Sequence, residues 1–174
     1  VTPDLFIKNN NVTNTSDMFL FCTTLQTAPN IPDGYTNDIS NMFNYCYRLK
    51  TPPAYIGNTV TNMCKAFNNC TNLATAPNIP DSVIDTSYAF YNCSNLTTPP
   101  SYIGNSVSNM CATFYSCNKM TPAPTIPNSV TDMTSTFMFC YQVKEAPDIP
   151  DSVVNMVQTF YGCYNLQTPP KYIG

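Results

Sequence analysis

The chain has 174 residues, only 10% of them charged, and its seven basic and ten acidic side chains give a net charge of −3. This balance argues against a nucleic-acid partner, which needs a basic surface, and against a polybasic membrane anchor. Histidine, the commonest general base and metal ligand, is absent. The hydrophobic share of 43% is enough for a core, and no apolar run reaches the roughly 18 residues of a transmembrane helix.

A pattern of 23 or 24 residues recurs along the chain, and its most regular member is a cysteine. The cysteines of this column are Cys22, Cys46, Cys70, Cys93, Cys117, Cys140 and Cys163. Each follows a phenylalanine by three residues and precedes an apolar residue by three, and a proline follows four residues further on. A fixed period in the twenties is typical of a solenoid, because each unit buries its apolar face only by stacking on its neighbours.

The N-terminal segment has the same phase as the C-terminal one. Thr2–Ile7 aligns with Thr51–Ile56, and the chain stops inside a further unit of that kind. Neither end has the polar sequence that normally covers the end of a solenoid. We therefore expect residues 1–174 to form a single solenoid array that is a fragment of a longer repeat protein, or one whose ends neighbouring chains cover.

Two kinds of unit follow one another along the chain. Those that contain the pair Ile-Pro, here called Ile-Pro units, start at Thr27, Thr75, Ala123 and Ala146. Those that read Thr-Pro-Pro and then Tyr-Ile-Gly, here called Tyr-Ile-Gly units, start at Thr51, Thr98 and Thr168. The second kind is one residue longer, which accounts for most of the variation in the period.

The segment before each column cysteine has the spacing of a short helix. Between Val60 and Cys70 the apolar residues fall at intervals of three and four, which places them within about 80° on a helical wheel. A short helix or 3₁₀ segment is therefore predicted there. Ser82 with Asp85, and Ser129 with Asp132, resemble a capping box in which Asp replaces Glu.

A short extended piece is predicted after each helix. Leu73–Ala76 leads into a proline, and Thr-Pro and Ala-Pro steps favour extended geometry, while the proline ends the pairing because it has no N–H. Stacked turns would form a parallel sheet of strands two to four residues long, about 4.8 Å apart. The face formed by these strands is mostly Thr and nearly uncharged. It could bind a partner with a flat surface, or it could simply be a sheet exposed to solvent.

The whole pattern, read for example from Pro127 to Cys140, is Pro-x-Ser-Val-x-x-Met-x-x-x-Phe-x-x-Cys, and it resembles the BspA-type leucine-rich repeats. The resemblance extends from Thr2 to Gly174. We expect an α/β repeat: a leucine-rich-repeat-type solenoid of about seven turns, with short parallel strands on one face and short helices or 3₁₀ turns on the other. The resemblance implies a secreted or cell-surface protein of microbes or their viruses that acts in adhesion, host contact or recognition.

The column cysteines admit a structural and a chemical interpretation. Cysteine is among the residue types most often buried, so a ladder of small apolar side chains is expected. A metal or redox site is disfavoured because there is no CxxC motif and no histidine. Cys64 and Cys111 lie outside the column, too far apart to bond to each other, and are interpreted as semi-buried packing residues. No cofactor and no metal is predicted.

Catalysis is not expected from this inventory. There is no Ser-x-x-Lys and no GxSxG motif. The aspartates that stand near turns, Asp81, Asp85, Asp132 and Asp151, are predicted to accept hydrogen bonds from backbone N–H groups. The sequence therefore predicts a protein that is not an enzyme.

Aromatic residues on the outer side of the predicted helices are the candidate binding residues. They are Phe21, Tyr45, Tyr47, Tyr91, Tyr115, Phe139, Tyr141, Tyr161 and Tyr164. Phe21 and Tyr45 are expected to be stacked neighbours, and Phe139 to be isolated. Exposed tyrosines among asparagines suit a protein or a glycan. The alternative is that the rings pack only against flanking loops or against one another.

The sequence thus predicts a non-catalytic recognition or adhesion module, extracellular or at the cell surface, that binds a protein on another cell or host surface. Two alternatives stay open at this stage. One is a structural fibre or filament whose protomers stack head to tail. The other is a glycan-binding module.

Overall fold

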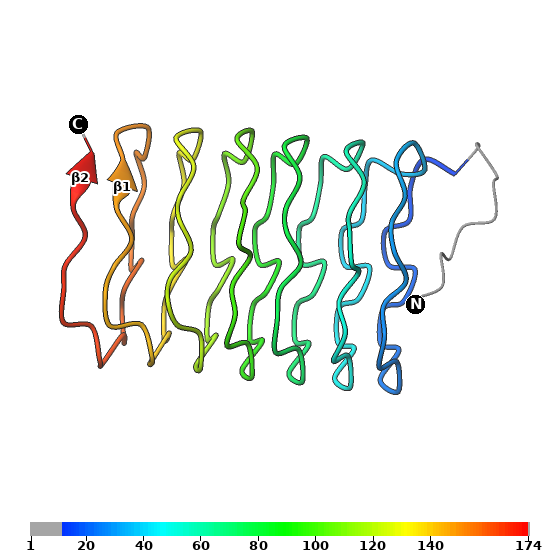
Figure 1. The fold of residues 1–174 in the computed structure, drawn as a ribbon, viewed down its shortest axis with the longest axis horizontal. Coiled ribbons are helices and arrows are strands. Elements are labelled where there is room, and N and C mark those ends of the chain that lie inside the picture. The colour runs from blue at the N-terminus through cyan, green and yellow to red at the C-terminus, as the bar shows by residue number, and fades with distance from the viewer. Residues whose placement is uncertain (1–11, 174) are drawn as a thin grey trace.

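The computed structural model describes residues 12–173, and the proposed match of Thr2–Ile7 to later units lies outside them. The chain winds into successive turns that lie side by side along one axis (Figure 1). The architecture is a repeat solenoid. Its core is one continuous cluster of buried apolar side chains that extends from Ala28 to Cys163.

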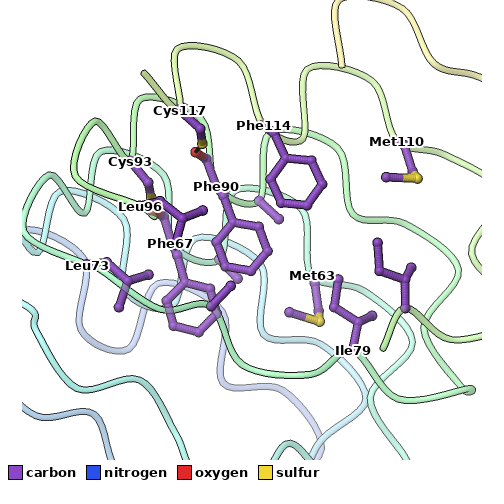
Figure 2. Packing of buried hydrophobic residues seen from close by; sticks show 14 of the residues in the cluster. Met63, Phe67, Leu73, Ile79, Phe90, Cys93, Leu96, Met110, Phe114 and Cys117 are labelled. Carbon is purple, nitrogen blue, oxygen red and sulfur yellow. Dashed lines mark hydrogen bonds between the residues drawn. The ribbon is translucent and has the colours of Figure 1, made fainter. Parts of the chain in front are cut away.

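The predicted stacking of like side chains is confirmed by the phenylalanines. Successive ring centroids are 5.3 to 5.8 Å apart and the ring planes lie within 18° of parallel. This phenylalanine spine consists of Phe19, Phe43, Phe67, Phe90, Phe114, Phe137 and Phe160. Figure 2 shows three of its rings one above another, with column cysteines and leucines beside them. Stacked aromatic rings of this kind bury large apolar area and dominate core energetics.

The predicted helix between Val60 and Cys70 is wrong. No residue of 12–173 lies in a helix, and this segment is a run of tight turns. Lys65 and Asn69 both have φ of 58°, in the left-handed region that an α-helix excludes. The same two positions have positive φ in the other turns, at residues 17 and 21, 41 and 45, 88 and 92, 112 and 116, 135 and 139, and 158 and 162.

Hydrogen bonding shows what replaces the helix. In the segment 63–69, alternate N–H groups donate to the next turn: the N–H of Lys65 to the carbonyl of Ser87, and that of Phe67 to the carbonyl of Ala89, at 2.9 and 2.8 Å. Between them, the N–H groups of Ala66 and Asn68 close turns three residues back, to the carbonyls of Met63 and Lys65 at 3.0 and 3.1 Å, and the N–H of Cys64 donates to Oδ1 of Asn62. Four of the seven amides of this segment therefore join neighbouring turns, whereas a helix would use all of them internally.

An Asn/Asp ladder forms one edge of every turn. Its members are joined by a parallel bridge at each step: Asn14, Asp38, Asn62, Asp85, Asn109, Asp132 and Asn155. The side-chain Oδ1 of each accepts a hydrogen bond from the N–H two residues later, at 2.7 to 3.4 Å. Because amide and carboxylate alternate, no two aspartates of the ladder are neighbours, which weakens repulsion between like charges.

The predicted capping boxes are wrong, although the aspartates do accept backbone N–H bonds as expected. The hydroxyl of Ser82 donates to the carbonyl of Val60 in the preceding turn at 2.6 Å, and that of Ser129 donates to the carbonyl of Val107 at 2.6 Å. Asp85 accepts the N–H of Ser87 at 2.8 Å. The serines therefore join turns and start no helix.

A second surface of the solenoid, here called the proline face, is formed by the segments that carry the repeat prolines. These segments are 26–32, 50–56, 74–80, 97–103, 121–127, 144–150 and 167–171. The only strands of this face among residues 12–173 are β1 (Ile149–Pro150) and β2 (Tyr172–Ile173), which pair in parallel. The strand predicted at Leu73–Ala76 is reduced to a single bridge, from Thr75 to Thr98.

Each bridge on the proline face joins an Ile-Pro unit to the Tyr-Ile-Gly unit after it. At the edge of the face, one bond runs the other way, from the N–H of Thr121 to the carbonyl of Thr97 at 3.3 Å. The bridges are Thr27 to Thr51, Ile31 to Ile56, Thr75 to Thr98, Ile79 to Ile103 and Glu145 to Thr168. In the first kind of unit the N–H of Ala28, and likewise of Ala76, donates across the interface, at 2.9 and 3.0 Å. In the second kind Pro52 and Pro99 stand at that position and have no N–H to donate, so pairing stops there.

Candidate functional site

The predicted binding residues gather in two aromatic clusters. The first cluster consists of Phe21, Tyr45 and Tyr47. The rings of Phe21 and Tyr45 are stacked with centroids 4.7 Å apart, as predicted, and Tyr47 meets Tyr45 edge-on at 5.8 Å. Phe21 is 59% exposed, so the outer end of this stack faces solvent.

The second cluster is larger and contains the other six predicted residues and one more. Its members are Tyr88, Tyr91, Tyr115, Phe139, Tyr141, Tyr161 and Tyr164. The expectation that Phe139 is isolated is wrong, because its ring lies edge-on to Tyr115 and Tyr161 at 5.5 and 5.6 Å. Tyr161 and Tyr164 are the most exposed members, at 58% and 79%.

Tyr88 was missed because only residues after the core phenylalanine were considered as outward-facing. It stands two residues before Phe90, in the first positive-φ column, and contacts Tyr91 with centroids 5.7 Å apart. The Nζ of Lys65 lies 5.8 Å from the centre of the Tyr88 ring. The sequence signal that could have identified Tyr88 is its position three residues before Tyr91, another tyrosine.

An asparagine bridge separates the clusters. Asn69 and Asn92 occupy the column of Phe21 and Tyr45 in the next two turns, the second of which also carries Tyr91, and Nδ2 of Asn92 donates to Oδ1 of Asn69 at 2.7 Å. Asn69 in turn donates to Asn68. The amide of Asn69 therefore lies in the turn between the two aromatic clusters, and the amide of Asn92 lies beside the second cluster.

The backbone under these aromatic residues is strained. Phe21, Tyr45 and Phe139 have φ of 59°, 61° and 62°, a region that bulky residues rarely adopt. Asparagine or glycine, which tolerate it, occupy the same column at Asn69 and Gly162. Because a positive φ recurs at this position in every turn, the strain belongs to the repeat and is not confined to the aromatic residues.

Gly162 makes room for Phe139. A Cβ added there would lie 2.4 Å from Cδ1 of Phe139, and its φ of +74° also favours glycine. The second cluster therefore depends on a residue without a side chain in the neighbouring turn.

The column cysteines are hydrogen-bonded thiols. From Cys46 to Cys163, each Sγ donates to the carbonyl of the spine phenylalanine in the preceding turn, at 3.0 to 3.2 Å. Burial raises the pKa of the Cys46 thiol to about 11 and that of Cys117 well above its ordinary value. Thiols held protonated are poor nucleophiles and metal ligands, which favours the buried-ladder interpretation. This donor role was not predicted from the sequence.

The remaining chemical groups are engaged in structure. Cys64 and Cys111 are half-buried free thiols, and the hydroxyl of Ser87 donates to Sγ of Cys64 at 3.3 Å. Residues 12–173 bring together no group of three or more acidic or cysteine side chains that could hold a metal ion. The pKa of Asp81 is lowered because the Tyr102 hydroxyl and then the Asn105 N–H donate to its carboxylate.

A family profile described as the BspA type leucine-rich repeat region matches the chain in six copies, over residues 3–97 and 54–167. A search of curated proteins and a search of solved structures gave no match. In the part of the chain that the structure describes, no helix has the length and apolar character needed to cross a membrane.

Proposed function

Because the chain belongs to the BspA-type leucine-rich repeat family, we propose that it is a non-catalytic recognition module, extracellular or at a cell surface, that binds a protein partner. Repeat proteins of this kind are often adhesion-related and generally non-enzymatic. In this proposal an array of about seven turns serves as a rigid rod and the aromatic clusters are its contact surface.

The observation that carries the proposal is the second aromatic cluster. Tyrosine is over-represented at the energetic centres of protein interfaces, because its ring buries large area and its hydroxyl satisfies a hydrogen bond. Tyr161 and Tyr164 are largely exposed, yet each rests on a half-buried ring, Phe139 and Tyr141 respectively. A partner therefore meets rings that are already ordered, so little side-chain entropy is lost on binding.

The low charge of the surface also supports a protein partner of modest charge. Within residues 12–173, Lys65 is the one basic side chain with a ring contact in either cluster. Binding should therefore depend on apolar contact and depend weakly on salt.

The test measures saturable binding of the labelled chain to cultured epithelial cells, before and after trypsin shaving or periodate oxidation of the cell surface. Trypsin should abolish the binding and periodate should leave it unchanged. The double variant Tyr161→Ala/Tyr164→Ala should weaken it at least tenfold, whereas Tyr102→Ala, outside both clusters, should not. Binding that survives trypsin, or that ignores the aromatic substitutions, contradicts the proposal.

A further inference from the structure

Of the grooves that cross the proline face, two are bordered by Tyr102, whereas a third, of about 310 Å³, lies further along the rod and is lined by Glu145 and Asp148. One of the two at Tyr102 lies between the turns of Tyr55 and Asn78, with a volume of about 260 Å³. The other lies between the turns of Tyr102 and Thr125, with a volume of about 280 Å³. Tyr102 is therefore a ridge with a groove on either side, and the two grooves form one track along the rod.

The grooves lie where the backbone is unpaired. Among the described residues, no backbone hydrogen bond joins 51–58 to 74–81, or 98–105 to 122–127. Each of these interfaces follows a Tyr-Ile-Gly unit, in which Pro52 and Pro53, or Pro99 and Pro100, supply no N–H. The repeated prolines thus create the openings at defined places.

Tyr102 is held in a fixed position over the first groove. Its hydroxyl donates to Oδ1 of Asp81 at 2.5 Å and accepts from Nδ2 of Asn105 at 3.1 Å. The N–H of Asn105 donates to the same Asp81 oxygen at 2.8 Å. Tyr102 is 41% exposed and Tyr55 is 45% exposed, so both rings offer a face to a ligand.

Polar groups with defined roles stand beside these rings. Oδ1 of Asn78 accepts from the N–H and the hydroxyl of Ser101, at 3.1 and 2.8 Å, and from the N–H of Tyr102 at 3.2 Å. This fixes the amide so that its Nδ2 is the group left to donate. Both bonds to Asp81 reach Oδ1, which leaves Oδ2 as an acceptor. The groove therefore offers a donor and an acceptor next to an aromatic face.

The chemistry selects one class of ligand. A peptide strand cannot add to this face, since the prolines withhold the backbone donors that strand addition needs. Asp81 is the one charged side chain that lines either groove, so a charged ligand is not favoured. The volumes fall below the roughly 300–1,000 Å³ usual for a compact ligand. A chain of small units, each with an apolar face and several hydroxyls, fits both grooves in succession.

We propose that the two grooves form a binding site for a neutral oligosaccharide. Sugar rings stack on Tyr55 and Tyr102, and their hydroxyls bond to Asn78 Nδ2 and Asp81 Oδ2. The site is distinct from both aromatic clusters: Tyr55 and Tyr102 follow the column cysteine by nine residues, whereas Tyr47 and Tyr164 follow it directly.

The experiment is calorimetric titration of the chain with defined neutral tetrasaccharides: those of cellulose, chitin, xylan, mannan and starch. At least one should bind saturably. Tyr102→Ala and Tyr55→Ala should each weaken that binding at least tenfold, and Tyr102→Phe, which keeps the ring and loses the bond to Asp81, should weaken it less. Tyr161→Ala, in the second aromatic cluster, should leave it unchanged.

Two results would overturn the proposal: no saturable binding of any tetrasaccharide, or binding that both Tyr55→Ala and Tyr102→Ala leave intact. Tyr55 and Tyr102 are exposed, and a circular dichroism melt of each variant verifies the fold. Trypsin-sensitive cell binding through Tyr161 and Tyr164 is a separate readout, so failure of this proposal is distinguishable from failure of the proposed function.

Discussion

The two sides of each turn are bonded to their neighbours in different ways. Along the Asn/Asp ladder every interface carries a backbone bridge, whereas on the proline face the bridges occur only between an Ile-Pro unit and the Tyr-Ile-Gly unit after it. The same period along the chain therefore produces a continuous ladder on one side and an interrupted one on the other. The grooves at Tyr102 appear on the side where prolines end the pairing.

Raising the pH should destabilise the core between the two sides, where the column cysteines lie. Burial raises the pKa of the thiols of Cys70, Cys93, Cys117 and Cys140 above the ordinary value of 9.0. Above pH 9 the unfolded chain loses these protons and the folded chain keeps them, so stability falls as the pH rises. Each thiol should contribute about 1.4 kcal/mol per pH unit above its ordinary pKa.

Urea unfolding between pH 8 and pH 11 measures this slope. Cys93→Ala should make it shallower. Equal slopes for the parent chain and Cys93→Ala would show that the column thiols are not held protonated.

Removing one spine ring should be the largest single substitution effect. Phe90 is fully buried between Phe67 and Phe114. Phe90→Ala should lower the free energy of unfolding by about 3–5 kcal/mol, because it leaves a cavity in a packed core. Tyr164→Ala, which removes an equally large but exposed ring, is the matched control and should stay within about 0.5 kcal/mol. Similar losses for the two variants would contradict a continuous spine.

Placing a proline at a paired interface should convert it into an unpaired one. Ala76→Pro removes the N–H that donates to the carbonyl of Thr98 and should lower the free energy of unfolding by about 1–3 kcal/mol. Pro52→Ala, at the equivalent position of an unpaired interface, should be nearly neutral. If the two substitutions change the free energy of urea unfolding equally, the prolines are not the reason why some interfaces of the proline face are paired and others are not.

The smallest effect concerns the Asn/Asp ladder. Asp85→Asn keeps the side-chain oxygen that accepts the N–H of Ser87, so stability should change by less than about 0.5 kcal/mol. Asp85→Ala removes the acceptor and should lower the free energy of unfolding by about 1 kcal/mol. An Asn variant as unstable as the Ala variant would mean that the charge, and not the hydrogen bond, matters at this position.

The sequence allowed the stacking to be predicted, because residues such as Phe67 and Cys70 recur with one period and must bury together. The turn geometry could not be predicted. Spacings of three and four are typical of a helix. The helix is broken by residues with positive φ, and some of these, such as Lys65 and Tyr45, are residue types that rarely adopt that conformation. Asn69, Asn92 and Gly162, which tolerate positive φ, were the available signal.

The aromatic residues were predicted to be outward-facing, and the structure places all nine in two clusters. The contacts between these rings depend on the exact turn geometry. The repeat positions in the sequence therefore did not predict that Phe139 lies at the centre of the second cluster or that Tyr88 belongs to it. The interrupted pairing could have been foreseen, since Pro52 lacks the N–H that Ala28 and Ala76 provide.

The central claim is that amides of the inner segment bond across turns. Scalar couplings across hydrogen bonds, measured by NMR on the isotope-labelled chain, test it directly. The account predicts a coupling between the amide nitrogen of Lys65 and the carbonyl carbon of Ser87. A coupling from Lys65 to the carbonyl of Thr61 instead, as in an α-helix, would contradict it.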